Sequence, residues 1–520
     1  MEKEFNVTGN CFPDRHYMAD VSHKMADTLK IVEKGLYFII NRPRQYGKTT
    51  TLYALSHALR QKQGYLVFNI SFEGVGDDFF QTEKTFAVGF MKILVKYARY
   101  GAVELLDGLK KSIAMTDGFQ DLDNNITDLC DLTEKKIVVL IDEVDQSSNN
   151  EVFIRFLAML RNKFLSRSEI PTFHSVVLAG VHDVKTLKMK IRPDSEQKYN
   201  SPWNIAADFK VDMNLYPHEI QPMLEDYVHE KKVLMDTSAM SYGLFYYTSG
   251  YPFLVSRLCK MMDEDLLPTK KTLSWTLEDL EIAVKRLVKE NNTNFESQIK
   301  HLENNAALYE MISTIAVDGE RFSFNLHNPV AHIALLYGLL SEKNGVFAIH
   351  NRIYQEVIVN YMTSKMELAQ MSKRIDLGGG YRNEDRTLNM EAVLLGFQSL
   401  MKREYSRKNR DFLEKHARLV FLAFLKPIIN GAGYDFKEPQ ISEEKRLDVV
   451  ITYYEHKYIA ELKLWRGQKL HEKGLVQLTD YLESQQLNEG YLLIFDHAEI
   501  KKWANEWITV QGKRIFMIWV

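Results

Sequence analysis

Short apolar segments alternate with amphipathic ones over the first third of the chain. The apolar segments are bounded by glycine, proline or polar residues, which is typical of buried strands, and helical periodicity separates them. Strands that are apolar on both faces indicate a parallel sheet covered by helices on each side. The pattern predicts strands at residues 36–40, 65–70, 136–141 and 173–179, and helices near residues 50–62, 86–97 and 152–165.

Later parts of the chain follow other patterns. From Pro217 the periodicity is helical, and further on the order becomes helix, extended piece, helix, hairpin, helix, with Asn344-Gly345 as a tight-turn signal. A polar stretch around Gly378-Gly379-Gly380 predicts a linker before a last set of strands and helices. The expected organisation is an α/β core at 1–216, a helical region at 217–302, a winged-helix-like unit at 303–365, a linker at 366–385 and a second α/β domain at 386–520.

Composition narrows the class of protein without indicating its chemistry. The 520 residues are 45% hydrophobic and 26% charged, which are ordinary globular values and exclude disordered or disulfide-scaffold proteins. No apolar run approaches the ~20 residues that cross a bilayer, and the first residues lack the pattern of a signal peptide. We therefore expect a cytoplasmic protein with no membrane partner. Its net charge of −3 still permits a local basic groove.

A motif suited to phosphate binding follows the first predicted strand. Gly47-Lys48-Thr49 opens a helix, where glycine lets the backbone approach phosphate oxygens and the helix N–H groups face the anion. In such loops the lysine reaches the β- and γ-phosphates and the threonine hydroxyl binds Mg²⁺. The general pattern has glycine where this chain has Arg42. The strand–loop–helix placement nevertheless favours a nucleotide site.

Two acids, Asp142 and Glu143, end the third predicted strand. In P-loop NTPases the aspartate at this place joins the Mg²⁺ shell, and a following acid or amide orients the attacking water. A buried strand that ends in solvated acids is the plain alternative. Because both motifs occur in the expected order, the sequence favours a nucleotide-hydrolysing site.

The first part of the chain resembles a group of bacterial AAA-like P-loop ATPases in which Arg-Pro-Arg-x-x-Gly-Lys-[Ser/Thr] replaces the usual loop. Arg42, Pro43 and Arg44 match that variant, and the resemblance extends over roughly the first 260 residues. It implies that residues 217–302 form a helical lid and that ATP and Mg²⁺ are the cofactors. The implied site consists of Arg44, Gly47, Lys48, Thr49, Thr50 and Asp142 for the nucleotide, Thr49 and Asp142 for Mg²⁺, and Glu143 for catalysis.

A second set of chemical groups stands on a predicted hairpin near the end of the chain. Glu461 and Lys463 are two residues apart and project to the same side of their strand, and Asp448 lies on the neighbouring strand. Two carboxylates bind Mg²⁺ or Mn²⁺, while a lysine orients or activates water, so the trio suits metal-assisted phosphodiester hydrolysis. An exposed strand with alternating Glu and Lys is the alternative, although the apolar flanks indicate a buried hairpin.

This hairpin and the helix and strand after it resemble the PD-(D/E)XK nuclease superfamily, specifically the small domain fused behind those ATPases. The proline of the strict motif is absent, because Leu447 precedes Asp448. The resemblance implies a restriction-endonuclease-like α/β fold with Gln477 beside the active site. Glu414 on the first helix is the candidate for a further metal ligand, with a solvated surface glutamate as the alternative.

Two hypotheses follow. In the first, the protein binds and hydrolyses ATP and thereby regulates or drives a fused Mg²⁺-dependent nuclease domain that acts on nucleic acid, DNA rather than RNA. In the second, it is a nucleotide-dependent signalling or assembly switch whose nuclease fold is non-catalytic and only binds. Besides nucleotide and nucleic acid, further copies of the chain are expected partners under both hypotheses. An arginine finger is not distinguished among Arg161, Arg167 and Arg192.

Overall fold

The computed structural model of the chain divides into two compact units, which are described separately. The first unit comprises Met1–Asn294 and His332–Leu339, and the second comprises Phe295–Ala331 and Leu340–Val520. The structure describes residues 2–147, 150–181, 203–318, 320–366, 381–383, 385, 387–404, 410–429, 433–438, 447–453, 456–465, 468–496 and 502–520. The central part of the predicted linker, including the three consecutive glycines, lies outside these residues.

A parallel sheet forms the centre of the first unit. Its strands, in the order β1-β4-β3-β2, are β1 (Phe38–Asn41), β4 (Ser175–Gly180), β3 (Lys136–Asp142) and β2 (Tyr65–Ser71). Every neighbouring pair is parallel, so the carboxyl ends of all four strands meet at one edge. The predicted α/β class with a parallel sheet is confirmed, and each strand end lies within two residues of its predicted position.

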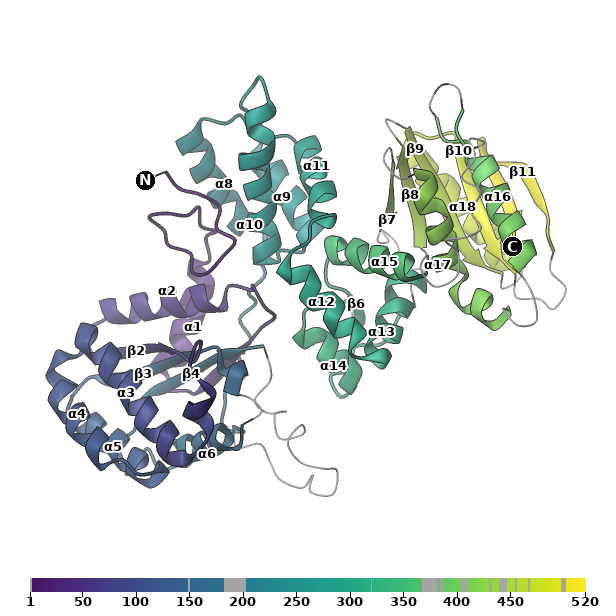
Figure 1. Ribbon diagram of the computed structural model, residues 1–520. Helices are drawn as coiled ribbons and strands as arrows, with labels where there is room; N and C mark the ends of the chain where they lie inside the picture. Colours follow the sequence, from purple (N-terminus) through teal and green to yellow (C-terminus); the bar gives the residue numbers. More distant parts are fainter. Residues whose placement is uncertain are drawn as a thin grey trace. The chain divides into compact units, whose positions relative to one another are not determined.

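Helices cover both faces of this sheet, with α1 and α2 on one side and α3, α5 and α6 on the other (Figure 1). The face toward α3 and α6 is packed with aromatic rings: the centroid of Phe86 lies 4.8 Å from that of Phe156, and Phe90 lies 5.1 Å from Phe156. The helices are α1 (Ser22–Glu33), α2 (Lys48–Gln61), α3 (Glu83–Gly101), α4 (Leu106–Met115), α5 (Phe119–Asp131) and α6 (Glu151–Leu165), with short 3₁₀ turns at Asp77–Phe80, Val103–Leu105 and Val144–Ser147.

From Pro217 the chain is helical, as the periodicity predicts. Pro217 stands at the first position of α8, where its missing N–H costs nothing, and Pro252 does the same for α10. The helices here are α8 (Pro217–Lys231), α9 (Thr237–Thr248), α10 (Pro252–Met261), α11 (Leu277–Val288) and α12 (Thr293–Glu303), with short π and 3₁₀ turns at Met262–Leu266 and Leu267–Thr269.

The predicted order of helix, extended piece, helix, hairpin and helix is present in the next segment. Asn344 and Gly345 both have positive φ, 53° and 77°, as a tight hairpin turn requires. The elements are α13 (Ala306–Ser313), a π turn at Thr314–Asp318, α14 (Pro329–Leu336), β5 (Leu340–Lys343), β6 (Val346–Ile349) and α15 (Arg352–Met366). Their identification as a winged-helix unit stays a prediction.

A mixed six-stranded sheet forms the C-terminal part of the second unit, in the order β11-β12-β10-β9-β8-β7. The predicted hairpin is present as β8 and β9, and β10 runs parallel to β9. Leu475, Leu478 and Leu482 of α18 pack on one face of this sheet. The elements are α16 (Met390–Glu404), α17 (Arg410–Ile429), β7 (Gly433–Glu438), β8 (Leu447–Tyr453), β9 (His456–Leu464), α18 (Gln468–Ser484), β10 (Glu489–Phe495), β11 (Asn505–Val510) and β12 (Lys513–Trp519).

Within the residues that the structure describes, no helix has both the length and the apolar character needed to cross a bilayer.

Candidate functional site

The P-loop, defined here as residues 42–47, joins the end of β1 to the start of α2. Gly47 adopts the left-handed conformation with φ +75° directly before the helix begins at Lys48, two residues earlier than predicted. The Lys48 side chain is buried, and its Nζ donates to the carbonyl oxygens of Arg42 at 2.9 Å and Pro43 at 2.8 Å. The strand, loop and helix order is that of a phosphate-binding loop. The ammonium group is therefore held inside the loop by carbonyls that phosphate oxygens can replace.

Acidic side chains gather at the same edge of the sheet, where β3 ends. Asp142 is buried, and its Oδ1 accepts the Glu143 N–H at 2.9 Å. Glu143 has φ +55°, a backbone conformation that is unusual for a residue with a side chain and that clusters at functional sites. Burial, together with the Asp142 charge, raises the pKa of Glu143. Glu143 is thus a half-buried carboxyl group with raised basicity beside a buried aspartate.

A third acid, Asp145, belongs to this edge although the sequence analysis did not select it. Its Oδ2 accepts the Val181 N–H at 2.5 Å, directly after β4. Burial lowers the pKa of Lys48, and Asp145 is the strongest of the three acids that oppose this shift. The spacing Asp142-Glu143-x-Asp145 was the available signal. The lysine of the loop therefore lies in the field of three carboxylates from the end of β3.

The predicted hydroxyl residues of α2 differ in their surroundings. Thr49 is exposed, so its hydroxyl is open to a ligand. Thr50 is part-buried, and its Oγ1 accepts the backbone N–H of Cys11 at 3.2 Å. This contact gives Thr50 a structural role in holding the N-terminal segment. Thr49 fits a Mg²⁺ ligand better than Thr50 does.

Side chains tie the P-loop to the hinge segment, defined here as residues 209–216. Arg42 Nη2 donates to the carbonyl of Val211 at 2.9 Å, and its guanidinium lies 5.5 Å from the Phe209 ring centroid. Tyr46 is buried, and its hydroxyl donates to Asn214 Oδ1. Arg42 stands at the position where the general motif has glycine. The replacement therefore adds a contact that glycine cannot make.

The P-loop is also tied to the helical region that follows the hinge segment. The Tyr251 hydroxyl donates to the carbonyl of Arg44 at 2.5 Å, and its ring packs edge-on against Tyr46 with centroids 4.6 Å apart. Asn294 Nδ2 donates to Gln45 Oε1 at 2.9 Å. The Gly250-Tyr251-Pro252 turn is thus both a helix start and a direct contact of the loop. Arg44, predicted to bind the nucleotide, has an exposed side chain.

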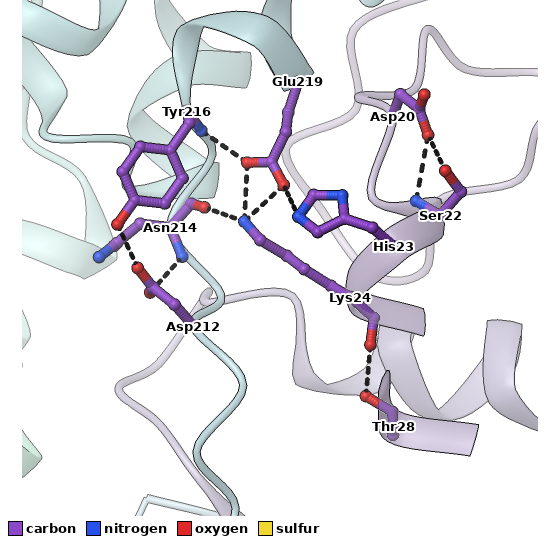
Figure 2. A network of polar contacts seen from close by, with 9 residues as sticks. All are labelled: Asp20, Ser22, His23, Lys24, Thr28, Asp212, Asn214, Tyr216 and Glu219. Carbon is purple, nitrogen blue, oxygen red and sulfur yellow. Dashed lines mark hydrogen bonds and ion pairs between the residues drawn. The ribbon is translucent and has the colours of Figure 1, made fainter. Parts of the chain in front are cut away.

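A buried ion pair between α1 and α8 also holds the hinge segment through hydrogen bonds (Figure 2). Lys24 Nζ lies 2.6 Å from Oε1 and 2.7 Å from Oε2 of Glu219, and it donates to the carbonyl of Asn214 at 2.5 Å. Glu219 Oε2 also accepts the backbone N–H of Tyr216 at 2.7 Å, which caps the start of α8. Asn214 therefore connects this network to the Tyr46 hydroxyl of the P-loop.

His23, His218 and Glu219 have the ligand types of a metal site, with ligand atoms within 4.8 Å of one another. His23 Nε2 lies 3.3 Å from Glu219 Oε1. The Lys24 ammonium, however, contacts both carboxylate oxygens and already neutralises their charge. A cation at this position would have to displace Lys24, so the cluster is an ion-pair network.

The second predicted site is only partly covered by the structure. The register of β8 and β9 places the Cα of Asp448 opposite that of Glu461, and β7 places Glu438 opposite Asp448. Glu461 is buried, and its Oε1 lies 3.2 Å from Lys463 Nζ. Three acidic positions thus form one row across β7, β8 and β9, and Glu438 was missed because it lies before the predicted hairpin.

The remaining predicted residues of this site are placed by element alone. Gln477 lies on α18 and Glu414 on α17. The side chains of Asp448, Gln477 and Glu414 lie outside the described part of the structure. Two of the arginine-finger candidates have partners of their own: Arg161 donates to Asn204 Oδ1 at 2.7 Å, and Arg167 lies 3.6 Å from the Phe164 ring centroid.

No protein-family model matches the chain, and no curated protein matches it either. Among solved structures, the Walker-type ATPase paby2304 of Pyrococcus abyssi is similar with a TM-score of 0.47 and 11% identity over 68% of this chain and 99% of that chain. The RuvB Holliday junction branch migration motor of Thermotoga maritima gives a TM-score of 0.34 and 14% identity over 68% and 98%. The ORC2 protein of Aeropyrum pernix gives 0.36 and 14% over 70% and 98%.

Proposed function

We propose that the first unit binds ATP with Mg²⁺ at the P-loop and hydrolyses it. The observation that carries this proposal is the position of Lys48: its buried ammonium group lies inside a loop at a helix start, in the field of Asp142, Glu143 and Asp145. A cation and several acids at the carboxyl edge of a parallel sheet are the groups that a Mg²⁺-nucleotide requires. The donor set fits, because carboxylate and hydroxyl oxygens are the ligands that Mg²⁺ prefers.

Each residue has a separate task in this proposal. The N–H groups at the start of α2 face the phosphates, and Lys48 exchanges its bonds to the Arg42 and Pro43 carbonyls for phosphate oxygens. Thr49 and Asp142 hold Mg²⁺, which supplies charge neutralisation at the transferred phosphoryl group. Glu143 orients the attacking water and takes its proton, a task for which a raised pKa is suited.

The direct test compares Lys48→Ala with Lys62→Ala. Lys62 follows the other end of α2 and forms an exposed ion pair with Glu33. Calorimetric titration with MgATP should show binding by the wild type and Lys62→Ala, and at least ~10²-fold weaker binding by Lys48→Ala, since a charge-assisted contact is worth several kcal/mol in total. Equal affinity of both variants would refute the assignment of the site.

Metal-dependent nuclease activity of the second unit is a second candidate function. It is supported by the row of Glu438, Asp448 and Glu461 across three strands and by the ion pair between Glu461 and Lys463. We infer that Asp448 and Glu461 hold Mg²⁺ or Mn²⁺, with Glu414 and Gln477 as accessory residues, and that the first unit regulates cleavage of nucleic acid, DNA in preference to RNA.

Plasmid DNA and RNA incubated with Mg²⁺ or Mn²⁺, with and without ATP, test this second function. The wild type and Lys457→Ala should cut, whereas Asp448→Ala and Lys463→Ala should not. Lys457 is the control because it lies on β9, as Lys463 does, but donates to Gln485 Oε1 at an exposed position. Lys48→Ala added to the series reports whether ATP controls cleavage.

If the wild type binds MgATP but cuts neither nucleic acid, the protein is instead the nucleotide-dependent switch of the second hypothesis, with a nuclease fold that only binds.

A further inference from the structure

The turn after α14 lies so close to the P-loop that its central position has no room for a side chain. Gly338 N–H donates to the carbonyl of Leu335 at 2.9 Å, and Leu339 N–H donates to that of Ala334 at 2.9 Å. This pair of bonds is the Schellman arrangement that ends a helix, and it places Gly338 at φ +71°. The conformation alone favours glycine at residue 338.

A second constraint comes from Pro43 of the P-loop. A Cβ atom at residue 338 would lie 2.7 Å from Pro43 Cγ, 3.0 Å from Pro43 Cβ and 3.7 Å from Tyr251 Cε2. Pro43 is buried, and its carbonyl accepts the Lys48 ammonium at 2.8 Å. The turn therefore packs on the residue whose carbonyl holds the lysine of the nucleotide site.

The residue beside Gly338, Tyr337, is half-buried and lies within the electrostatic reach of an acid of the same site. Burial raises the pKa of Tyr337, and the charge of Asp145 adds to this shift. Asp145 is anchored by the Val181 N–H at the end of β4. His332–Leu339 belongs to the first unit, whereas the chain on both sides of it belongs to the second. The turn is thus a short insertion from a later part of the chain into the nucleotide-binding unit.

We propose that the turn formed by Tyr337, Gly338 and Leu339 positions the P-loop, so that nucleotide affinity depends on whether this turn is seated on Pro43. The ring of Pro43 is part of the backbone and fixes its φ, so pressure on the ring is transmitted to the loop backbone that carries the carbonyl bound by Lys48. A misplacement of about 1 Å in such a site costs up to ~10²-fold in the rate of the chemical step. The proposal rests on ATP being the ligand of the P-loop and adds a regulatory contact to it.

Gly338→Ala and Gly345→Ala form a matched pair for the test. Gly345 also has a positive φ, +77°, but nothing lies within 4 Å of an added Cβ. Both variants carry similar backbone strain, and only one of them presses on the P-loop. In the absence of nucleotide, hydrogen exchange of peptides spanning residues 42–48 should become about tenfold faster in Gly338→Ala and stay within about twofold in Gly345→Ala. MgATP affinity should fall in Gly338→Ala and stay nearly unchanged in Gly345→Ala.

If the peptides spanning residues 42–48 exchange hydrogen at the same rate in the two variants, the proposal is overturned, whether or not the protein binds MgATP. If the exchange differs but the wild type does not bind MgATP, the ATPase assignment fails while the contact between turn and loop stands. Should Gly338→Ala not fold, the wild type decides: because coupling is reciprocal, saturating MgATP must slow exchange of peptides spanning residues 333–341. An unchanged rate there, with MgATP bound, contradicts the proposal.

Discussion

Replacing Lys24 by methionine removes the ammonium group that neutralises a fully buried carboxylate. The Glu219 side chain is 0% exposed, and Lys24 is its partner at 2.6 and 2.7 Å. Methionine keeps most of the apolar stem of lysine, so the change deletes charge and hydrogen bonds rather than packing. The prediction is a loss of stability that is centred on the start of α8.

The size of the stability loss follows from the burial of Glu219 and from the contacts that it keeps. Removing one partner of a buried ion pair costs about 3–5 kcal/mol, because the other charge is left in a medium of low polarity. Glu219 retains the Tyr216 N–H at 2.7 Å and His23 Nε2 at 3.3 Å, which favours the lower end of that range. At about 2–4 °C per kcal/mol for a large domain, a loss of about 3 kcal/mol lowers the Tm by roughly 6–12 °C.

Calorimetric unfolding of the full chain measures the shift, and hydrogen exchange of α8 peptides assigns the transition to the first unit. Lys30→Met is the matched control, since Lys30 lies on the same helix and pairs with Asp27 at 2.8 Å. Both of those side chains are more than half exposed and screened by water, so the control should leave the Tm nearly unchanged.

A second substitution checks the cause of the loss. Glu219→Gln in the Lys24→Met background removes the uncompensated charge while it keeps an acceptor for the Tyr216 N–H. The double variant should therefore recover more than half of the decrease in Tm that Lys24→Met causes. The reasoning is refuted if Lys24→Met is as stable as Lys30→Met, or if the second substitution lowers the Tm further.

Three predictions concern the proposed nucleotide site. Glu143→Gln should retain MgATP binding and hydrolyse ATP at least ~10²-fold more slowly, and lost binding in titration would contradict its catalytic role. Because the pKa of Glu143 is raised and the ionised form takes the proton, the wild-type rate should begin to fall on acidification at a pH above the ordinary glutamate pKa of ~4.3. A constant rate down to that pH would contradict this. Tyr251→Phe removes the hydrogen bond to the Arg44 carbonyl and should weaken MgATP affinity about fivefold, for about 1 kcal/mol, whereas Tyr242→Phe at an exposed position of α9 should leave it unchanged.

The elements of the first unit could be predicted because their signals are local. Every residue of β3 from Ile137 to Asp142 is buried, so the strand appears in the sequence as an uninterrupted apolar run that ends at the acid. Lys48 was recognisable because a helix start after a strand and a glycine is a local pattern. Asp145 was overlooked because its role depends on β4, which follows later in the chain.

The second predicted site shows a different limit of prediction from sequence. Alternation predicted that Glu461 and Lys463 share a side of β9, and their ion pair is present at 3.2 Å. That Glu438 is in line with Asp448 depends on the pairing of β7 with β8, and register is a property of the sheet rather than of either strand.

Local sequence patterns were enough to predict the strands of the first unit and the chemical groups at their ends, because hydrophobic period and helix-start chemistry act over a few residues. The roles of Arg42, Tyr46 and Pro43 became visible only in the folded chain. Pro43 and Tyr46 occupy positions that the general motif leaves open, and Arg42 occupies the position where that motif has glycine. Their partners, Gly338, Asn214 and Val211, come from distant parts of the chain. A contact between residues far apart in sequence leaves no periodic trace in either segment, so only the folded chain shows that this loop is held from several sides.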